Sequence, residues 1–278
     1  MDKAFWQTIR EQDCAVPEDC TVLDLTPELI AMLGATDPVL RDELASAIFG
    51  CWIERGLYTP DHLRGLAMHL VTNLGIGLGE PRGDGVFLRA TSAFALAQII
   101  ARDNKRNFLS QNEVENLFHW SLAYLRDERD LRGFVPKKGW AAALTRSAEL
   151  LRALARNRHL TLSDLETLLT ALAERVTTPT ATVFAHDEDE RLVAVVWTVL
   201  QRQLVALPFL ADWLERCTGV MALVGADAPF EPNRYAAYQN TRLFLRSLYF
   251  RLAFARNRPE LNRKLQAQVL EAVRAVQE

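Results

Sequence analysis

Residues 101–113, with the sequence ARDNKRNFLSQNE, separate two segments in which apolar residues recur every three or four positions. That recurrence is the period of an α-helix that buries one face. The apolar set before this stretch is Phe94, Leu96, Ala97, Ile99 and Ile100, and the set after it is Val114, Leu117, Phe118, Leu122 and Leu125. Within the stretch, Ser110 precedes Glu113 by three positions, the pattern of a capping box. The stretch therefore predicts the end of one helix and the start of the next.

Similar junctions recur along the chain. Helices are predicted to end near residues 53–56, 101–104, 155–158 and 255–258, and to begin again near Thr59, Ser110, Ser163 and Pro259. Ser163 stands three positions before Glu166 in a second capping-box pattern, and prolines mark the starts at Thr59 and Pro259. With a further junction at residues 201–203, the spacing is about fifty residues, the length of two helices and their loops in a helical solenoid.

Signals for β-strands are nearly absent, so we predict an all-α protein. Its expected architecture is an α-solenoid-like, HEAT-like stack of about five helical hairpins. The predicted hairpins are residues 37–74, 87–126, 138–176, 188–222 and 234–277. They are expected to form one helical-repeat domain, residues 37–278, after an N-terminal helical extension, residues 1–36. The alternative is an irregular helical bundle in which the recurrence is accidental.

The predicted loops differ in length according to their place. Loops inside the hairpins are short, whereas the loops between them, at residues 75–85, 127–138, 177–186 and 224–233, are long. In a stack of hairpins these four long loops lie on one edge. Long loops are often functional, so this edge is the first place to look for a site, although the loops can equally serve as bridges between hairpins.

The composition excludes several classes of protein. Hydrophobic residues make up 49% of the 278 residues and charged residues 24%, as in ordinary globular proteins. A net charge of −3 gives no overall attraction to nucleic acid or to an anionic membrane. No apolar run approaches the ~20 residues of a membrane span. The start, MDKAFW, has no apolar targeting core, and the four cysteines follow no metal or redox spacing, so we expect a cytoplasmic protein with free thiols.

No complete catalytic, cofactor or metal motif is present in the sequence. The five histidines include no pair at the four-residue spacing of a helical metal site. There is no Gly-x-Ser-x-Gly elbow and no phosphate-binding Walker loop. The glycine-rich residues 75–79 lack a preceding strand, which weakens a dinucleotide-binding interpretation. We therefore expect neither a metal nor a cofactor.

The strongest candidate site gathers charged residues and one tryptophan from two of the long loops. Its members are Asp84, Arg89, Glu128, Asp130, Arg132, Lys138 and Trp140. Gly139 and Trp140 are expected to open a helix, whose free N–H groups attract anions. Such a cluster can hold a phosphate, a carboxylate or a peptide terminus. The alternative is a structural latch, in which Asp84 or Glu128 pairs with Arg132 and Trp140 is wedged between layers.

A second candidate is the arginine-rich C-terminal region. Its cations are Arg234, Arg242, Arg246, Arg251, Arg256, Arg258, Arg263 and Lys264, interleaved with aromatic residues. Helical solenoids can bind nucleic acid through such a face. However, Tyr235, Tyr238, Leu245 and Tyr249 follow the spacing of a helix core, and a near-neutral chain is a poor polyanion binder. We therefore expect a core helix with surface ion pairs and no nucleic-acid binding.

Several strings in the chain carry a family resemblance. They are DGVFLR at residues 84–89 with Ser92, YL at 124–125 with Glu128, DLRGFV at 130–135, KGWA at 138–141, ERL at 190–192, and Asn240 with FLRSLY at 244–249. With these motifs the chain resembles a bacterial family of uncharacterised proteins, catalogued as domain of unknown function 2785. The resemblance spans about residues 84–249 and implies a compact helical domain without an activity to transfer.

One departure from the family pattern bears on metal binding. Histidines commonly follow the Gly-Trp-Ala element in the family and recur one helical turn later, whereas here Ala142 and Arg146 hold these places. A metal site through such a pair is therefore not expected in this chain.

Two functions of different classes follow from these observations. The first is an interaction module, a helical-repeat scaffold whose loop edge or concave face holds a protein or peptide partner. The second is an enzyme or small-ligand protein that uses Asp84, Arg89, Glu128, Arg132, Lys138 and Trp140 on an anionic ligand. The absence of a complete catalytic set favours the first.

Overall fold

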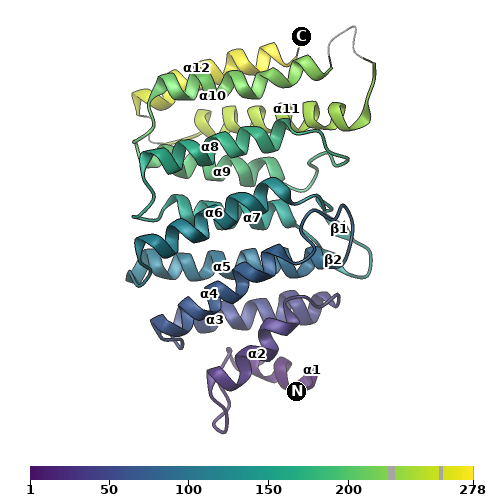
Figure 1. Ribbon diagram of the computed structural model, residues 1–278, viewed down its shortest axis with the longest axis vertical. Helices are drawn as coiled ribbons and strands as arrows, with labels where there is room; N and C mark the ends of the chain where they lie inside the picture. Colours follow the sequence, from purple (N-terminus) through teal and green to yellow (C-terminus); the bar gives the residue numbers. More distant parts are fainter. Residues whose placement is uncertain (225–228, 257–258, 278) are drawn as a thin grey trace. The chain divides into compact units, whose positions relative to one another are not determined.

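The computed structural model describes residues 1–224, 229–256 and 259–277. Within these residues the chain forms twelve α-helices and one hairpin of two very short strands, which confirms the all-α prediction (Figure 1). By its internal contacts the chain divides into two units, Met1–His159 and Leu160–Glu278. Residues 225–228 of the predicted loop 224–233, and residues 257–258 of the last predicted junction, lie outside the described residues.

The first unit contains seven α-helices and the hairpin. Its elements are α1 (Lys3–Glu11), α2 (Val22–Met32), the π-helical segment η1 (Val39–Ser46), α3 (Ala47–Arg55), α4 (Pro60–Gly75), α5 (Gly85–Arg106), α6 (Gln111–Asp127), β1 (Phe134–Val135), β2 (Gly139–Trp140) and α7 (Ala143–Ala155).

The predicted helix starts at Thr59 and Ser110 are confirmed. The Thr59 side chain accepts the His62 amide in front of α4, and Ser110 forms a capping box with Glu113 in front of α6. Such caps satisfy backbone N–H groups that have no partner inside the helix. The end of α3 is set by Gly56, whose φ of +73° is a left-handed conformation that favours glycine.

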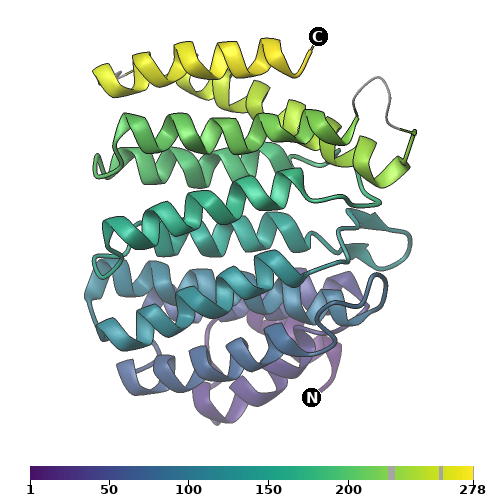
Figure 2. The same ribbon diagram turned by 45° about the horizontal axis from the view of Figure 1, so that its top comes forward.

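The helices of the first unit pack in two layers. One layer contains α3, α5 and α7 side by side, and α4 packs beside α6 in the other. In Figure 1, α4 and α6 lie in front of α3 and α5, and Figure 2 shows the same helices from a second direction. The backbones approach closely between α4 and α5 and between α6 and α7, which are the pairs joined by the two long loops.

The N-terminal helices share the core of the first unit. Trp6 on α1 and Trp52 on α3 are fully buried, and their ring centroids are 6.5 Å apart. The indole N–H of Trp52 donates to the carbonyl oxygen of Cys14 at 2.8 Å, so the buried ring has a polar partner. The segment between α1 and α2 is thereby held against α3.

The second unit has the same kind of layering. Its elements are α8 (Leu162–Thr177), α9 (Glu188–Gln201), α10 (Leu207–Thr218), the 3-10 segment η2 (Gly219–Leu223), α11 (Pro232–Ala253) and α12 (Glu260–Ala275). The helices α8, α10 and α12 lie side by side, and α9 packs beside α11. Trp213 is buried in this core and donates its indole N–H to the Leu169 carbonyl oxygen at 2.6 Å.

Two predicted helix starts are displaced. The second unit's first helix begins at Leu162, because Thr161 and Asp164 form the capping box expected two positions later at Ser163. The helix predicted from Gly139 begins only at Ala143. Gly139 and Trp140 form β2, which pairs with β1, so the helix can begin only after this hairpin.

Among the described residues, no helix combines the length and the apolar character that crossing a membrane requires. The described residues also contain no group of three or more histidine, cysteine or acidic side chains placed to hold a metal ion. All four cysteines carry free thiols.

Candidate functional site

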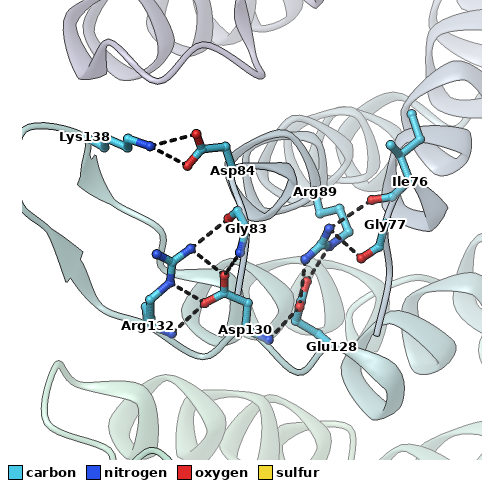
Figure 3. A network of polar contacts seen from close by, with 9 residues as sticks. All are labelled: Ile76, Gly77, Gly83, Asp84, Arg89, Glu128, Asp130, Arg132 and Lys138. Carbon is cyan, nitrogen blue, oxygen red and sulfur yellow. Dashed lines mark hydrogen bonds and ion pairs between the residues drawn. The ribbon is translucent and has the colours of Figure 1, made fainter. Parts of the chain in front are cut away.

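The loops at residues 75–85 and 127–138 lie against each other at one end of the first unit (Figure 3). The most buried contact between them is an ion pair between Arg89 at the start of α5 and Glu128 after α6. Nε of Arg89 donates to Oε2 of Glu128 at 2.6 Å, and Nη2 donates to Oε1 at 2.9 Å. The remaining Nη1 donates to the carbonyl oxygens of Ile76 and Gly77. Each of the three guanidinium nitrogens thus donates to an acceptor inside the protein.

Burial and charge act in opposite directions on Arg89. Burial alone would lower its pKa, but the hydrogen bond and the charge of Glu128 outweigh burial, so the pKa of Arg89 is raised above its usual value. The neighbouring Tyr124 is fully buried, and burial together with the Glu128 charge raises its pKa well above the usual range. Arg89 therefore stays charged and Tyr124 stays neutral at any ordinary pH.

A second ion pair lies within the loop at residues 127–138 and is joined to the other loop through Gly83. Arg132 donates from Nε and Nη2 to the carboxylate of Asp130 at 2.8 and 2.6 Å. It also donates to the Gly83 carbonyl oxygen, while the Gly83 amide donates back to Asp130. The Asp130 amide donates to Glu128, which links this pair to the first one. The hydrogen bonds that Arg132 donates to Asp130 raise the pKa of Arg132.

Lys138 and Asp84 form the outermost contact of the cluster. The Lys138 ammonium lies 2.8 and 2.7 Å from the two carboxylate oxygens of Asp84. Both side chains are partly exposed, at 39% and 51%. This pair is the part of the predicted cluster whose charges meet solvent.

Trp140 lies in a β-hairpin that the sequence did not predict. Phe134 pairs with Trp140 across the two strands, and Val135 pairs with Gly139. The two aromatic rings meet edge to face with their centroids 5.4 Å apart. Trp140 is 49% exposed and Phe134 57%. The expectations that Trp140 opens a helix and that its ring is wedged between layers are therefore wrong.

Arg41, which the sequence analysis does not single out, donates hydrogen bonds to the backbone of the β1–β2 hairpin. Arg41 lies in η1, is fully buried, and donates to the carbonyl oxygens of Ala35 and Lys138 at 2.9 and 3.0 Å. A longer contact of 3.5 Å reaches the Trp140 carbonyl oxygen. Its guanidinium also lies 4.3 Å from the centre of the Phe87 ring. No motif around Arg41 distinguishes it from the other arginines in the sequence.

Gly139 is required by this arrangement for two independent reasons. Its φ of +76° favours glycine, and a Cβ at this position would lie 2.8 Å from Cβ of Pro38. The backbone of β2 can therefore approach Pro38 and Arg41 only without a side chain here.

All seven predicted site residues gather at this end of the unit, but the partners differ from those of the predicted latch. Glu128 pairs with Arg89, Arg132 with Asp130, and Asp84 with Lys138. The charges of Arg89, Glu128 and Asp130 are buried and meet internal partners. Arg146, one helical turn after Ala142, lies 4.0 Å over the Phe94 ring and forms an ion pair with Glu149 at 3.0 Å.

A different part of the first unit offers open space. Two adjacent hollows of about 300 Å³ and 370 Å³ lie along the layer of α3, α5 and α7. Gln98, Ala101 and Lys105 of α5 line both hollows, so the two adjoin along these residues and together make a grooved surface across the three helices. We refer to it as the α5 groove. Its other lining residues are Ala47, Gly50, Cys51, Ile53, Glu54 and Arg102 on one side, and Phe94, Ala97, Asn104, Glu149, Arg152, Ala153 and Arg156 on the other.

The arginine-rich helix α11 is mainly a core helix, as expected. Phe244, Leu245, Leu248 and Leu252 are buried, but Tyr235 is exposed, so its assignment to the core is wrong. Arg242 lies over the Tyr238 ring and Arg251 over the Trp197 ring. Two cations of this helix thus lie over aromatic side chains, and a third, Arg234, lies 4.0 Å from Glu231.

The fold and the site define an all-helical protein with layered helices and a locked loop cluster at one end of its first unit. The family described as "Protein of unknown function (DUF2785)" matches residues 74–250. This match covers more than half of the chain, so the protein belongs to that family, and the predicted resemblance is confirmed. No curated protein and no solved structure matches the chain. The matched range contains α5, α7 and both loops of the cluster, while Arg41 and Gly50 precede it.

Proposed function

We propose that this protein is a helical-repeat interaction module of the HEAT-like, α-solenoid type, and that it holds an extended segment of a protein partner in the α5 groove. The two adjoining hollows along α3, α5 and α7 carry the proposal. Layered helices leave such grooves on the face that they do not bury, and helical-repeat proteins use these faces for binding. The layering inside each unit supports the repeat architecture.

The groove exists because its floor is made of small side chains. Gly50 on α3, Ala97 and Ala101 on α5, and Ala153 on α7 face it. A longer apolar residue at any of these positions would fill the space between neighbouring helices. Lys105, Arg156 and Glu54 stand exposed around this floor and can meet a polar partner.

An enzyme or small-ligand site at the loop cluster has less support. A ligand there would have to displace internal partners from Arg89, Glu128 and Asp130, which are all buried. The most exposed groups of this cluster are the Lys138 and Asp84 pair and the two aromatic rings of the hairpin. Free thiols at all four cysteines fit a reducing compartment such as the bacterial cytoplasm.

Selection from a random library of displayed peptides tests the proposal. Peptides that bind the protein are expected to lose binding to Ala101→Trp, because an indole at this exposed position on α5 fills the groove. Thr72→Trp, at an exposed position on α4, is the matched control and is expected to bind like the unaltered protein. Circular dichroism and thermal melting establish that both variants are folded. Failure to select any peptide, or equal binding to Ala101→Trp, would overturn the proposal.

A further inference from the structure

We infer that the first unit holds a small-molecule site for an uncharged, mainly apolar ligand that donates one hydrogen bond to the side chain of Asn73. The site is a hollow of about 660 Å³ between α2, α4 and α5, which we call the α2–α4 pocket. The residues that line it belong neither to the loop cluster nor to the α5 groove. The inference therefore goes beyond the proposed function.

The size of the pocket suits a small molecule. Ligand sites commonly have volumes of about 300–1,000 Å³. Ten described residues line this pocket, fewer than the roughly 20–30 residues that a stable protein–protein interface takes on each side. Ala31 near the end of α2, and Gly34 and Ala35 after it, form part of the wall. Because these residues have little or no side chain, they leave space that larger residues would fill.

The lining of the pocket indicates a ligand without charge. Among the described residues that line it there is no aspartate, glutamate, lysine or arginine, and the polar side chains are Thr26, His69 and Asn73. An ionised group that leaves water without a partner loses much more hydration free energy than an apolar group gains by burial. The pocket therefore favours an uncharged molecule that is apolar over most of its surface.

Two of the three polar residues already have partners or water. The Thr26 hydroxyl donates to the Val22 carbonyl oxygen at 2.7 Å and lies 2.8 Å from the Tyr58 hydroxyl. It is therefore engaged inside the protein. His69 is exposed, so water can reach its ring nitrogens. Neither residue needs a ligand to complete its hydrogen bonds.

Asn73 supplies the polar group of the site. The residue is only 6% exposed, and its Nδ2 donates to Oγ of Ser92 on α5 at 3.2 Å. The other end of the amide, Oδ1, has no hydrogen-bond partner among the described residues, yet it is not sealed from solvent. Because Asn73 lines the pocket, a ligand that fills the pocket displaces water from this oxygen. The ligand that fits best therefore carries a hydroxyl or N–H group to replace that water.

Three probes that share one ring system test the inference on the full chain. N-phenyl-naphthylamine is uncharged and carries one N–H donor, its N-methyl derivative lacks the donor, and anilinonaphthalene sulfonate adds a negative charge. Their fluorescence rises in apolar surroundings, so a titration gives each dissociation constant. We expect N-phenyl-naphthylamine to bind about tenfold more tightly than either of the others, since one loses the hydrogen bond and the other must desolvate its charge.

Three variants locate the binding. Ala31→Trp places an indole in the pocket from an exposed position on α2, and we expect it to weaken N-phenyl-naphthylamine at least about tenfold. Ala101→Trp, at an exposed position in the α5 groove, is the matched control and is expected to bind the probe unchanged. Asn73→Leu removes the acceptor at similar side-chain volume. We expect it to bind the amine and its N-methyl derivative equally, a loss of preference that a merely structural role of Asn73 would not cause.

Each remaining outcome would contradict the inference. Absence of probe binding, or unchanged binding to Ala31→Trp, would refute the site. Equal binding of the amine and its N-methyl derivative to the unaltered protein, or the same preference in Asn73→Leu, would refute the role of Asn73. A dimer in light scattering that Ala31→Trp dissociates would show that a second copy of the chain covers the pocket instead. Peptides selected for the α5 groove should still bind Ala31→Trp, so failure of this site leaves the proposed function standing.

Discussion

Arg89 and Glu128 form a two-pronged ion pair across two loops, with N–O distances of 2.6 and 2.9 Å and almost no exposure to solvent. Removal of one partner leaves the other charge buried without compensation, which typically costs about 3–5 kcal/mol. Arg89→Ala is therefore expected to lower the free energy of unfolding by about that amount. Urea denaturation measures the effect.

Arg132→Ala provides a comparison for this prediction. Arg132 is 23% exposed, so water can reach part of the site left by its side chain, and we expect a smaller loss of about 1–3 kcal/mol. An Arg89→Ala variant that is as stable as the unaltered protein would show that the buried pair does not hold the loops together.

Tryptophan is usually a buried residue and arginine an exposed one, but here Arg41 is buried and Trp140 is half exposed. We therefore expect the loss of Arg41 to lower stability more than the loss of Trp140. Trp140→Ala removes a ring that is half exposed, and we expect it to change stability by less than about 1 kcal/mol. Arg41→Ala leaves the partly buried carbonyl oxygens of Ala35 and Lys138 without their donor and empties the buried site of the side chain, so we expect a loss of about 3 kcal/mol. Thermal melting of both variants is the measurement, and a reversed order would contradict the structure.

Asp103 gives a prediction about pH. Burial alone would raise its pKa, but the Leu109 amide, the Arg158 guanidinium, the Asn157 side chain and the Phe108 amide all donate to it and lower the pKa below its usual value. A carboxyl with a lowered pKa in the folded state contributes stability above its unfolded pKa, and this contribution is lost as the pH falls through the folded value.

The unfolding free energy is therefore expected to fall below about pH 4, where unfolded aspartate becomes protonated. In Asp103→Asn this acid-dependent loss should be smaller, and the variant should be about 1–3 kcal/mol less stable at neutral pH. Denaturation curves at several pH values test both points. An identical pH dependence in the two proteins would exclude Asp103 as a source of the effect.

The thiols are expected to differ in reactivity. Burial, together with a hydrogen bond to Cys51, raises the pKa of Cys14 to about 11, and burial raises the pKa of Cys217 to about 12. Since the thiolate is the nucleophile, both residues should resist alkylation in the folded protein at mildly alkaline pH. Mass spectrometry after iodoacetamide treatment, with denatured protein as the control, measures this. Rapid labelling of Cys217 in the folded protein would contradict its burial.

Much of the fold follows from local chemistry that is legible in the sequence. The starts at Thr59 and Ser110 depend on a cap and on residues three positions later, so they could be predicted without tertiary information. The helix start predicted at Ser163 lies two positions after the observed one, because Thr161 and Asp164 form an equivalent capping box. Spacing alone does not distinguish two overlapping boxes.

The sequence indicates where the charged residues of the loop cluster gather, but not which cation pairs with which acid. Long loops and clustered charge identify the end of the unit at which Arg89, Glu128 and Asp130 meet. Which cation takes which acid depends on positions set by packing, so Arg132 could not be assigned to Asp130 in advance. The contact from Arg41 to Lys138 joins residues 97 positions apart, and nothing local to either residue indicates it.

These sequence separations have a mechanical consequence. Arg89 reaches Glu128 over 39 positions and Asp103 reaches Arg158 over 55, so these contacts tie neighbouring segments together. Arg41 instead spans 97 positions to the hairpin at Lys138. A force applied at the N-terminus should therefore meet its main resistance when η1 is pulled from β2. Once the contacts of Arg41 are broken, the segments that follow it in the sequence should unfold one after another at lower force.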